Sequence, residues 1–236
     1  MLILFDIDAT LLTTTRAGIK AMGSAGRELY GPSFDEHAVE YSGRLDPLII
    51  RDLLTVHRLP DDQPAMEAFR AGYRKHLGIL LQDRSLARPC PGVMQLLDAI
   101  PASQDITLGL LTGNFPETGG MKLRAAGIDP DRFQVAAWGC DSPHSPPARD
   151  HLPPVAMDRQ AARTGRRPDP RSVVIIGDTP HDVACARAHG LRSLAVATGL
   201  FSVEELMASG ADRTVATLED TLDIVSWLVG SRAPAA

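Results

Sequence analysis

The sequence of 236 residues has few cysteines, few aromatic residues (5%) and no long apolar run. Cys90, Cys140 and Cys185 are odd in number and widely spaced, with no CxxC or Cys/His cluster, so neither a disulfide framework nor a zinc site is indicated. No stretch approaches the roughly 20 apolar residues that span a bilayer, and the N-terminus lacks the basic and long apolar regions of a signal peptide. We therefore expect a cytoplasmic protein with no membrane partner.

Basic residues are outnumbered by acidic ones, and lysine is scarce. The net charge of −5 and the pI near 5.8 argue against nucleic acid as a partner. Lysine occurs only at Lys20, Lys75 and Lys122, so a mechanism that requires a lysine has few candidates. The length and the 44% hydrophobic content fit one α/β domain with a large insertion, or two small domains, as a monomer or a homodimer.

About 75 residues with a helical pattern follow the first apolar run, far more than a crossover between two strands requires. The first predicted helix covers 16–30, and Asp46-Pro47 supplies the second with an N-cap and a proline at its first position. The third has the i, i+3, i+4 spacing of one buried face, at Met66, Phe69, Tyr73, Leu77 and Leu80. We predict a small all-helical domain at residues 15–87.

From Pro91-Gly92 onward, short apolar runs alternate with helical patterns that end at glycines. This alternation predicts an α/β fold with a Rossmann-like parallel sheet and helices on both faces, formed by residues 1–14 and 88–236. A proline-rich loop is expected at 143–154 and a disordered tail at 231–236. Beyond the first strand, the predicted strands are 106–111, 135–138, 173–176 and 193–196, with one more before the last helix.

Polar residues follow three of the predicted strands directly. In a parallel sheet the carboxyl ends of the strands share one edge, so residues far apart in the sequence converge on one pocket there. Chance explains one such strand end more readily than three. The three segments are Asp6-Ile7-Asp8, Thr112-Gly113-Asn114 and Gly177-Asp178-Thr179-Pro180-His181-Asp182.

These acidic residues fit the needs of phosphoryl transfer, which are a nucleophile in line, a cation and an acid for the leaving group. Asp6 is suited to attack phosphorus and form an aspartyl-phosphate. Asp8 is suited to protonate the departing oxygen and then to deprotonate the hydrolytic water. Asp178, Asp6 and the backbone carbonyl of Asp8 offer the hard oxygen ligands that Mg²⁺ prefers. Asp182, in the first turn of the next helix, is expected to hold metal-bound waters or to orient Asp178.

The phosphate itself needs donors and a cation. Thr112 and the backbone N–H groups of Gly113 and Asn114 lie at a helix start, which suits an anion. Lys122 follows in that helix, and we expect it to pair with the nucleophile and the phosphate, unless it is a solvated lysine on the helix surface. Arg149, in the proline-rich loop, is the alternative cation.

The order of a DxD triplet, an apolar stretch ending in TGN and an apolar stretch ending in GDTxxD resembles the haloacid dehalogenase superfamily across essentially the whole chain. The helical insertion resembles the type-1 cap of phosphoglycolate phosphatase-like and β-phosphoglucomutase-like members. The resemblance implies that Asp6 is the nucleophile, Asp8 the acid/base, Thr112 the phosphate-binding hydroxyl and Asp178 the magnesium ligand.

Details of the motifs narrow the reaction and mark two departures from the family. Members that cleave carbon–halogen bonds or phosphonates lack an acid at the position of Asp8, so phosphate-ester chemistry is favoured. Arg44 lies in a loop that resembles the substrate-facing loop of capped phosphatases. We expect it either to bind a substrate carboxylate or second phosphate, or to be a surface arginine ahead of a helix. Ala9 stands where the family has glycine; if φ is positive there, alanine costs about 1 kcal/mol. The family's third-motif lysine is absent from its usual place, where only arginines occur.

The sequence therefore predicts a magnesium-dependent phosphatase that acts on a small phosphorylated metabolite, with a cap that closes to exclude water. A phosphotransferase of the same family is the closest alternative. A binding protein that keeps the fold without turnover is another, motivated by Ala9 and the displaced lysine. A receiver-type signalling domain is disfavoured because such domains are about half as long and have no cap.

Overall fold

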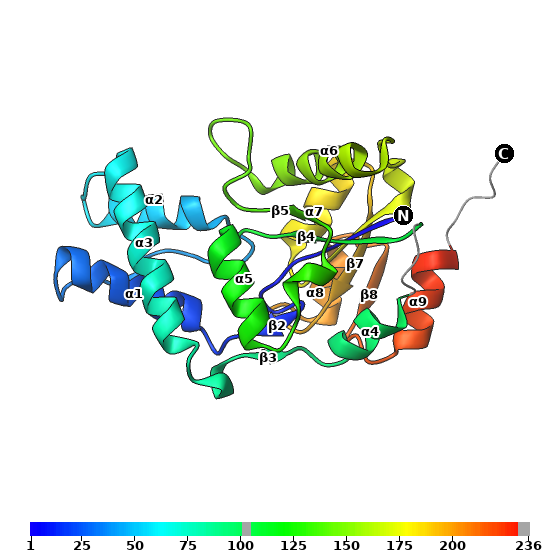
Figure 1. Cartoon of the computed structure of the whole chain (residues 1–236), viewed down its shortest axis with the longest axis horizontal. Coiled ribbons are helices and arrows are strands. Elements are labelled where there is room, and N and C mark those ends of the chain that lie inside the picture. Colours follow the sequence, from blue (N-terminus) through cyan, green and yellow to red (C-terminus); the bar gives the residue numbers. More distant parts are fainter. Residues whose placement is uncertain (101–104, 231–236) are drawn as a thin grey trace.

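The computed structural model describes residues 1–100 and 105–230, in which six parallel strands form one sheet in the order β5-β4-β1-β6-β7-β8 (Figure 1). The central strand β1 pairs with β4 on one side and β6 on the other. The strands whose ends carry the three polar segments are therefore neighbours, and the predicted parallel α/β fold is confirmed. The bounds are β1 Leu2–Phe5, β4 Thr107–Leu111, β5 Val135–Ala137, β6 Val173–Gly177, β7 Arg192–Val196 and β8 Arg213–Val215.

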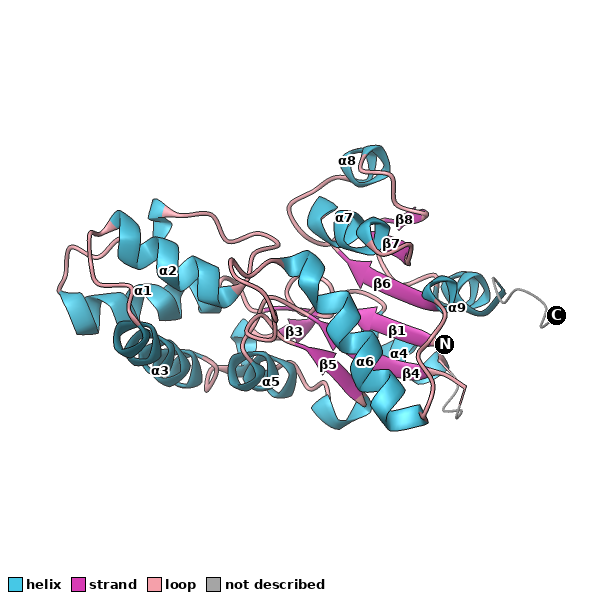
Figure 2. Ribbon diagram, turned by 90° about the horizontal axis from the view of Figure 1, so that it is seen from above, coloured by secondary structure: helices cyan, strands magenta, loops and turns pink. Residues whose placement is uncertain are grey.

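Side chains that alternate along the strands bury two separate cores, one on each face of the sheet. Figure 2 shows the helices that cover the sheet. Ile3 and Phe5 pack in the core that contains residues of helices α4 (Val93–Ala99), α5 (Pro116–Ala125) and α9 (Thr221–Gly230). Leu2 and Leu4 pack in the core with helices α6 (Leu152–Thr164) and α7 (Pro180–Ala188). Helix α8 (Val203–Ala208) adds Leu206 to a small cluster beside β7.

The part of the chain that joins the short antiparallel strands β2 (Leu12–Thr13) and β3 (Arg88–Pro89) contains three helices, which form a separate lobe (Figure 1). They are α1 (Ala17–Tyr30), α2 (Asp46–Val56) and α3 (Gln63–Leu80), close to the helices predicted from the sequence. Phe69, Tyr73 and Leu77 are buried in the core of this helical insertion, as their spacing indicates, while Met66 and Leu80 are partly buried against it.

Where the insertion meets the rest of the molecule, each part contributes a buried side chain to the hydrophobic core of the other. Leu45, just before α2, is buried with Leu111 in the core between the sheet and helices α6 and α7. Phe115, just before α5, is buried in the core of the insertion. Arg70 of α3 forms two hydrogen bonds, 2.6 and 2.8 Å long, with the carboxylate of Glu117 and stacks over the Phe115 ring. Helix α5 is thus held by both parts of the molecule.

Some local predictions differ from the structure. The proline-rich loop ends earlier than residue 154, because the 3₁₀ helix η4 (Arg149–His151) and then α6 begin within it. Pro153 and Pro154 fit the first turn of α6, where backbone N–H groups have no partner inside the helix. Asp46 is the first residue of α2, with Leu45 in the cap position.

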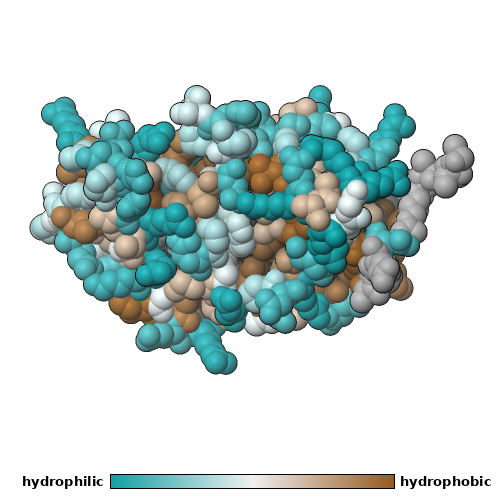
Figure 3. Space-filling model, turned by 45° about the horizontal axis from the view of Figure 1, so that its top comes forward, coloured by the Kyte–Doolittle hydropathy of each residue, from teal (hydrophilic) through white to brown (hydrophobic). Residues whose placement is uncertain are grey.

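The predicted tail at 231–236 lies outside the described residues, and the domain limits at residues 15 and 87 stay predictions. No helix among the described residues is long and apolar enough to cross a membrane. The face drawn in Figure 3 is largely hydrophilic, with hydrophobic patches of limited size.

Candidate active site

A cavity of about 740 Å³ opens at the carboxyl ends of β1, β4 and β6. The loop at 40–46, which leads into α2, forms the wall that faces the strand ends, and residues 198–201 after β7 complete the lining. The structure therefore brings together most of the side chains chosen from the sequence. The lining includes Asp6, Asp8, Arg44, Thr112, Gly113, Asn114, Lys122, Arg149 and Asp178, whereas Asp182 lies just behind it.

Three aspartates from two strand ends gather on one side of the cavity. Carboxylate oxygens of Asp6, Asp178 and Asp182 all lie within 4.8 Å of one another, and all three side chains are buried. Asp182 is fixed by a capping box at the start of α7, in which Thr179 and Asp182 each bond the other's backbone N–H. Burial raises the pKa of Asp6 to about 6 and, with the charges of Asp182 and Asp6, that of Asp178 to about 8.

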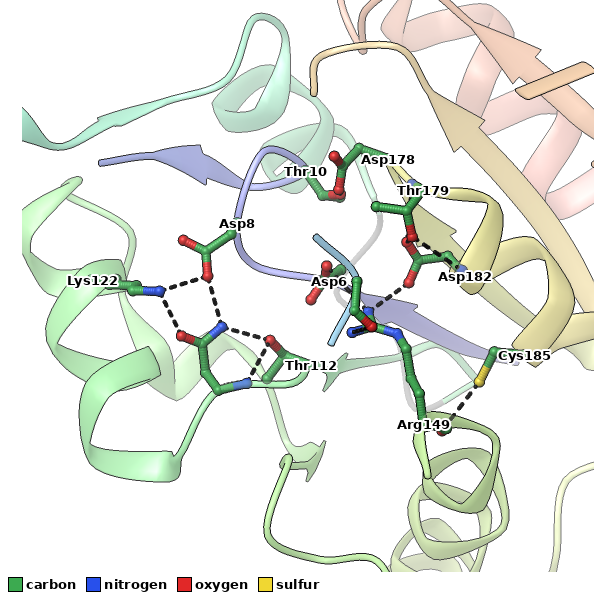
Figure 4. A network of polar contacts seen from close by, with 12 residues as sticks. Asp6, Asp8, Thr10, Thr112, Lys122, Arg149, Asp178, Thr179, Asp182 and Cys185 are labelled. Carbon is green, nitrogen blue, oxygen red and sulfur yellow. Dashed lines mark hydrogen bonds and ion pairs between the residues drawn. The ribbon is translucent and has the colours of Figure 1, made fainter. Parts of the chain in front are cut away.

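The cation beside the first aspartate is Arg149. Its Nη2 atom lies 3.1 Å from Asp6 Oδ2 and 2.6 Å from Asp182 Oδ1, and the guanidinium is almost fully buried (Figure 4). Nη1 donates to the carbonyl of Gly43 in the insertion, while Nε has no hydrogen-bond partner among the described residues. Of the two cations weighed from the sequence, the structure places Arg149, rather than Lys122, beside Asp6.

Lys122 instead pairs with the second aspartate of the triplet. Its Nζ atom lies 2.6 Å from Asp8 Oδ2 and 2.6 Å from Asn114 Oδ1, and the Asn114 amide donates to the same Asp8 oxygen at 2.8 Å. Asn114 also donates to Thr112 Oγ at 2.9 Å, which links the end of β4 to this network (Figure 4). Lys122 is buried, whereas the side chain of Asp8 is 43% exposed, so Asp8 is held firmly but faces the cavity.

The turn after Asp8 departs from ordinary backbone geometry. Ala9 has φ of 57°, in the left-handed region where alanine is disfavoured by roughly 1 kcal/mol. Its N–H donates to the Leu12 carbonyl at 2.7 Å, and its carbonyl accepts from the hydroxyl of Thr198. Thr10, one residue further, donates to Asp178 Oδ1 at 3.2 Å. These bonds hold the turn in place with alanine in it.

The residues that sequence reasoning missed here are Thr10 and Thr198. Thr10 lies two positions after Asp8, so the alternation of side-chain direction that pairs Asp6 with Asp8 could have indicated that Thr10 faces the same way. Thr198, 189 residues from Ala9, had no such signal.

The insertion contributes Arg44 and Asp46 to the cavity wall. Arg44 Nη2 forms an ion pair of 2.5 Å with Asp52 in the second turn of α2, so part of its charge is already matched. Asp46 is buried, and its carboxylate accepts from the N–H of Phe115 and the hydroxyl of Thr118. Burial raises the pKa of Asp46 to about 7. The sequence placed Asp46 at a helix start but carried no sign that it caps a different helix.

The acidic cluster fits a hard divalent cation. Carboxylate oxygens are the ligands that Mg²⁺ prefers, and three of them converge at one point. Burying these carboxylates together raises the pKa values of Asp6 and Asp178 although Arg149 lies between Asp6 and Asp182. A cation bound here would offset that cost, which the guanidinium alone does not do.

Fold and site together define an α/β protein with a carboxylate centre at the carboxyl edge of its sheet and a helical insertion facing it. The sequence profile described as haloacid dehalogenase-like hydrolase matches residues 3–196. Since this match covers most of the chain, the chain belongs to that family, and the resemblance drawn from its motifs is confirmed.

Individual relatives cover nearly the whole chain at low identity. A protein described as a probable phosphatase, IndB, from Dickeya dadantii (strain 3937) is 26% identical over 223 residues, covering 94% of this chain and 91% of the relative. Pyrophosphatase PpaX of Bacillus pumilus (strain SAFR-032) is 25% identical over 239 residues, with 94% and 95% covered. A solved structure described as a predicted phosphoglycolate phosphatase of Haemophilus somnus 129PT shares the fold, with a TM-score of 0.70, 21% identity and coverage of 94% and 96%.

Proposed function

We propose that this chain is a magnesium-dependent phosphatase that hydrolyses a small phosphorylated metabolite through an aspartyl-phosphate on Asp6. The observation that carries the proposal is the different surroundings of the two aspartates of the triplet. Asp6 is buried against Arg149 and beside two further carboxylates, whereas Asp8 is half-exposed and held by Lys122 and Asn114. These surroundings support a nucleophilic role for Asp6 and an acid/base role for Asp8.

The reaction runs in two steps. An oxygen of Asp6 attacks phosphorus, the bond from phosphorus to the leaving oxygen breaks, and Asp8 gives its proton to that oxygen. Asp8, now ionised beside Lys122, takes a proton from water, which attacks phosphorus, releases phosphate and restores the Asp6 carboxylate. The Lys122 and Asn114 contacts both engage the same Asp8 oxygen, Oδ2, which leaves the other oxygen for both proton transfers.

Charge supports a metal requirement. Six carboxylates lie at the cavity or beside it (Asp6, Asp8, Glu40, Asp46, Asp178 and Asp182), whereas the cations there among the described residues are the buried Lys122 and Arg149, with Arg16 and Arg44 in the lining. A phosphate ester that enters this site brings further negative charge. Asp6, Asp178 and Asp182, together with the backbone carbonyl of Asp8, would hold Mg²⁺, which when bound neutralises phosphate oxygens for attack.

Phosphate binding is assigned to the segment after β4 and to Arg149. Thr112, Gly113 and Asn114 line the cavity where α5 is about to begin, and there the Thr112 hydroxyl and the backbone N–H groups of this segment would donate to phosphate, although the Asn114 N–H also has Thr112 Oγ as an acceptor. Arg149 lines the cavity with its guanidinium beside Asp6, so a phosphate held at Asp6 would contact this arginine, which would then take the role that a lysine has in the family's third motif. Lys122 then serves Asp8 instead of the nucleophile.

The insertion at 15–87 acts as a cap in this proposal. Its loop at 40–46 covers the strand ends, so its docked position excludes bulk water while the phosphoenzyme forms. Arg44 stands in the same wall, where it meets a carboxylate or second phosphate of the substrate if it exchanges its partner Asp52.

A screen of phosphorylated metabolites with Mg²⁺, and in parallel with chelator, tests the function. We expect phosphate release from at least one small ester, abolished by chelator and by Asp6→Asn. Acid quenching during turnover should trap phosphate on the wild-type protein and not on Asp6→Asn. Lack of phosphate release across the panel, together with no effect of Asp6→Asn, would refute the proposal.

A further inference from the structure

Asp46 joins the insertion to the segment that carries the partners of Asp8. Its backbone N–H donates to the Gly113 carbonyl at 2.7 Å, and one carboxylate oxygen accepts from the N–H of Phe115 at 3.2 Å and from Thr118 Oγ at 3.4 Å. We propose that Asp46 is a positioning residue through which the docking of the insertion sets the acid/base aspartate, Asp8. This inference rests on the phosphatase function proposed above.

Helix α5 depends on this carboxylate for its start. The cap position is Phe115, whose side chain has no oxygen, and Pro116 follows it. The first N–H groups of a helix have no partner inside the helix, and the usual remedy is an oxygen from the cap residue itself. Here Asp46, 69 residues earlier in the chain, accepts from the backbone N–H of the cap residue Phe115 itself, and an acceptor oxygen also suits the positive end of the helix dipole. The Phe115 N–H at the start of α5 therefore has this acceptor only with the insertion docked.

The segment held in this way carries both partners of Asp8. Asn114 lies between Gly113 and Phe115, the two backbone groups that Asp46 binds. Lys122 lies four residues after Thr118, on the same side of α5. A displacement of the helix start therefore moves the amide and the ammonium group that grip one oxygen of Asp8.

The loop before α2 packs tightly against the segment that follows β4. A methyl group at Gly113 would lie 2.0 Å from the carbonyl oxygen of Arg44, so the two backbones touch. Leu45 is almost fully buried in the core between the sheet and helices α6 and α7. Asp46 follows directly, and its position is fixed by its neighbours on the insertion side. Movement of the insertion is therefore transmitted to α5 through Asp46 and is not absorbed by a flexible loop.

The test separates a positioning role from a structural one by the leaving group. An alkyl phosphate needs a proton from Asp8 as its bond to phosphorus breaks, whereas an aryl phosphate with a stable phenolate leaving group does not. We expect Asp46→Ala to lower kcat/KM about tenfold or more for the alkyl ester and less than about threefold for the aryl ester, as misplacement of a general acid predicts. Asp46→Asn, which keeps an acceptor oxygen, should restore most of the alkyl-ester rate.

Two further variants keep the result interpretable. Thr118→Val removes one donor to Asp46 without changing side-chain size, and it should reproduce the selective loss in weaker form even if Asp46→Ala folds poorly. Asp62→Ala removes the capping oxygen of α3, which bonds Ala65 within the insertion, and it should affect neither ester.

Equal losses on both esters, or no loss, would overturn the positioning role while leaving the phosphatase function intact. A wild-type chain that released phosphate neither from these esters nor from any member of the metabolite panel would refute the function, and the inference with it.

Discussion

The contact between Gly113 and the insertion yields a sharp test of how the two parts of the molecule fit together. A Cβ atom at this position would lie 2.0 Å from the Arg44 oxygen and 2.9 Å from the Arg44 carbonyl carbon, both of them backbone atoms that cannot rotate away. Since carbon atoms in contact normally lie about 3.5 Å or more apart, one of the two segments must move by about 1 Å in the Gly113→Ala variant.

Two consequences follow for Gly113→Ala, one thermodynamic and one kinetic. Overpacking of this kind costs about 1 to 3 kcal/mol, which should appear as a lower midpoint in urea unfolding. The same displacement moves the N–H groups assigned to phosphate, and an error of about 1 Å in such a site lowers kcat/KM by about 100-fold.

Gly120→Ala is the matched control in the same region. Gly120 lies inside α5, and its added Cβ would meet at 3.2 Å only the mobile end of Arg124. Alanine is favoured over glycine in a helix by about 1 kcal/mol, so Gly120→Ala should be neutral or stabilising and should keep the rate. If Gly113→Ala matched Gly120→Ala in both stability and rate, the docking of the loop against the end of β4 would be wrong.

Three further outcomes are expected. Lys122→Met should lower kcat/KM for alkyl phosphates by about 100-fold, because Asp8 loses the cation that stabilises its ionised form; unchanged steady-state rates would refute this pairing. Ala9→Gly should raise stability by up to about 1 kcal/mol in urea and leave turnover within about twofold, whereas a large gain in activity would mark the wild type as impaired. Because burial raises the pKa of Asp46 to about 7, the folded state binds its proton more tightly than the unfolded chain, so the contribution of this group to the unfolding free energy falls as pH rises from about 4 to 7; the slope of unfolding free energy against pH should be more positive for Asp46→Asn than for the wild type in urea titrations, and an unchanged slope would contradict the shift.

The parts of the site that follow from strand order were predictable from the sequence. Apolar runs ending in polar segments identify β1, β4 and β6, and a parallel sheet brings their carboxyl ends to one edge. That rule is enough to place Asp6, Asp8, Thr112 and Asp178 around one cavity. It acts through the backbone alone and needs no knowledge of which side chains touch.

The pairing of charges was beyond the sequence. Lys122 and Arg149 were both recognised as candidate cations, but which one meets Asp6 depends on distances across separate loops. Arg149 reaches Asp6 because η4 lies beside α7, and Lys122 reaches Asp8 because α5 rises directly from the end of β4. Such distances follow from packing, which local pattern does not encode.

Because Arg149 pairs with Asp6 and Lys122 pairs with Asp8, docking of the insertion affects both steps of the proposed reaction. Arg149 binds Asp6 and also the Gly43 carbonyl in the insertion, so the surroundings of the nucleophile are complete only when that loop is in place. Lys122 binds Asp8 from α5, and Asp46 at the end of the same loop accepts from the Phe115 N–H at the start of that helix. One loop therefore touches the partners of both aspartates within four residues of chain. In the proposed mechanism, a substrate small enough to let the loop dock would allow Asp6 and Asp8 to act together, whereas one that held the insertion away would disable both.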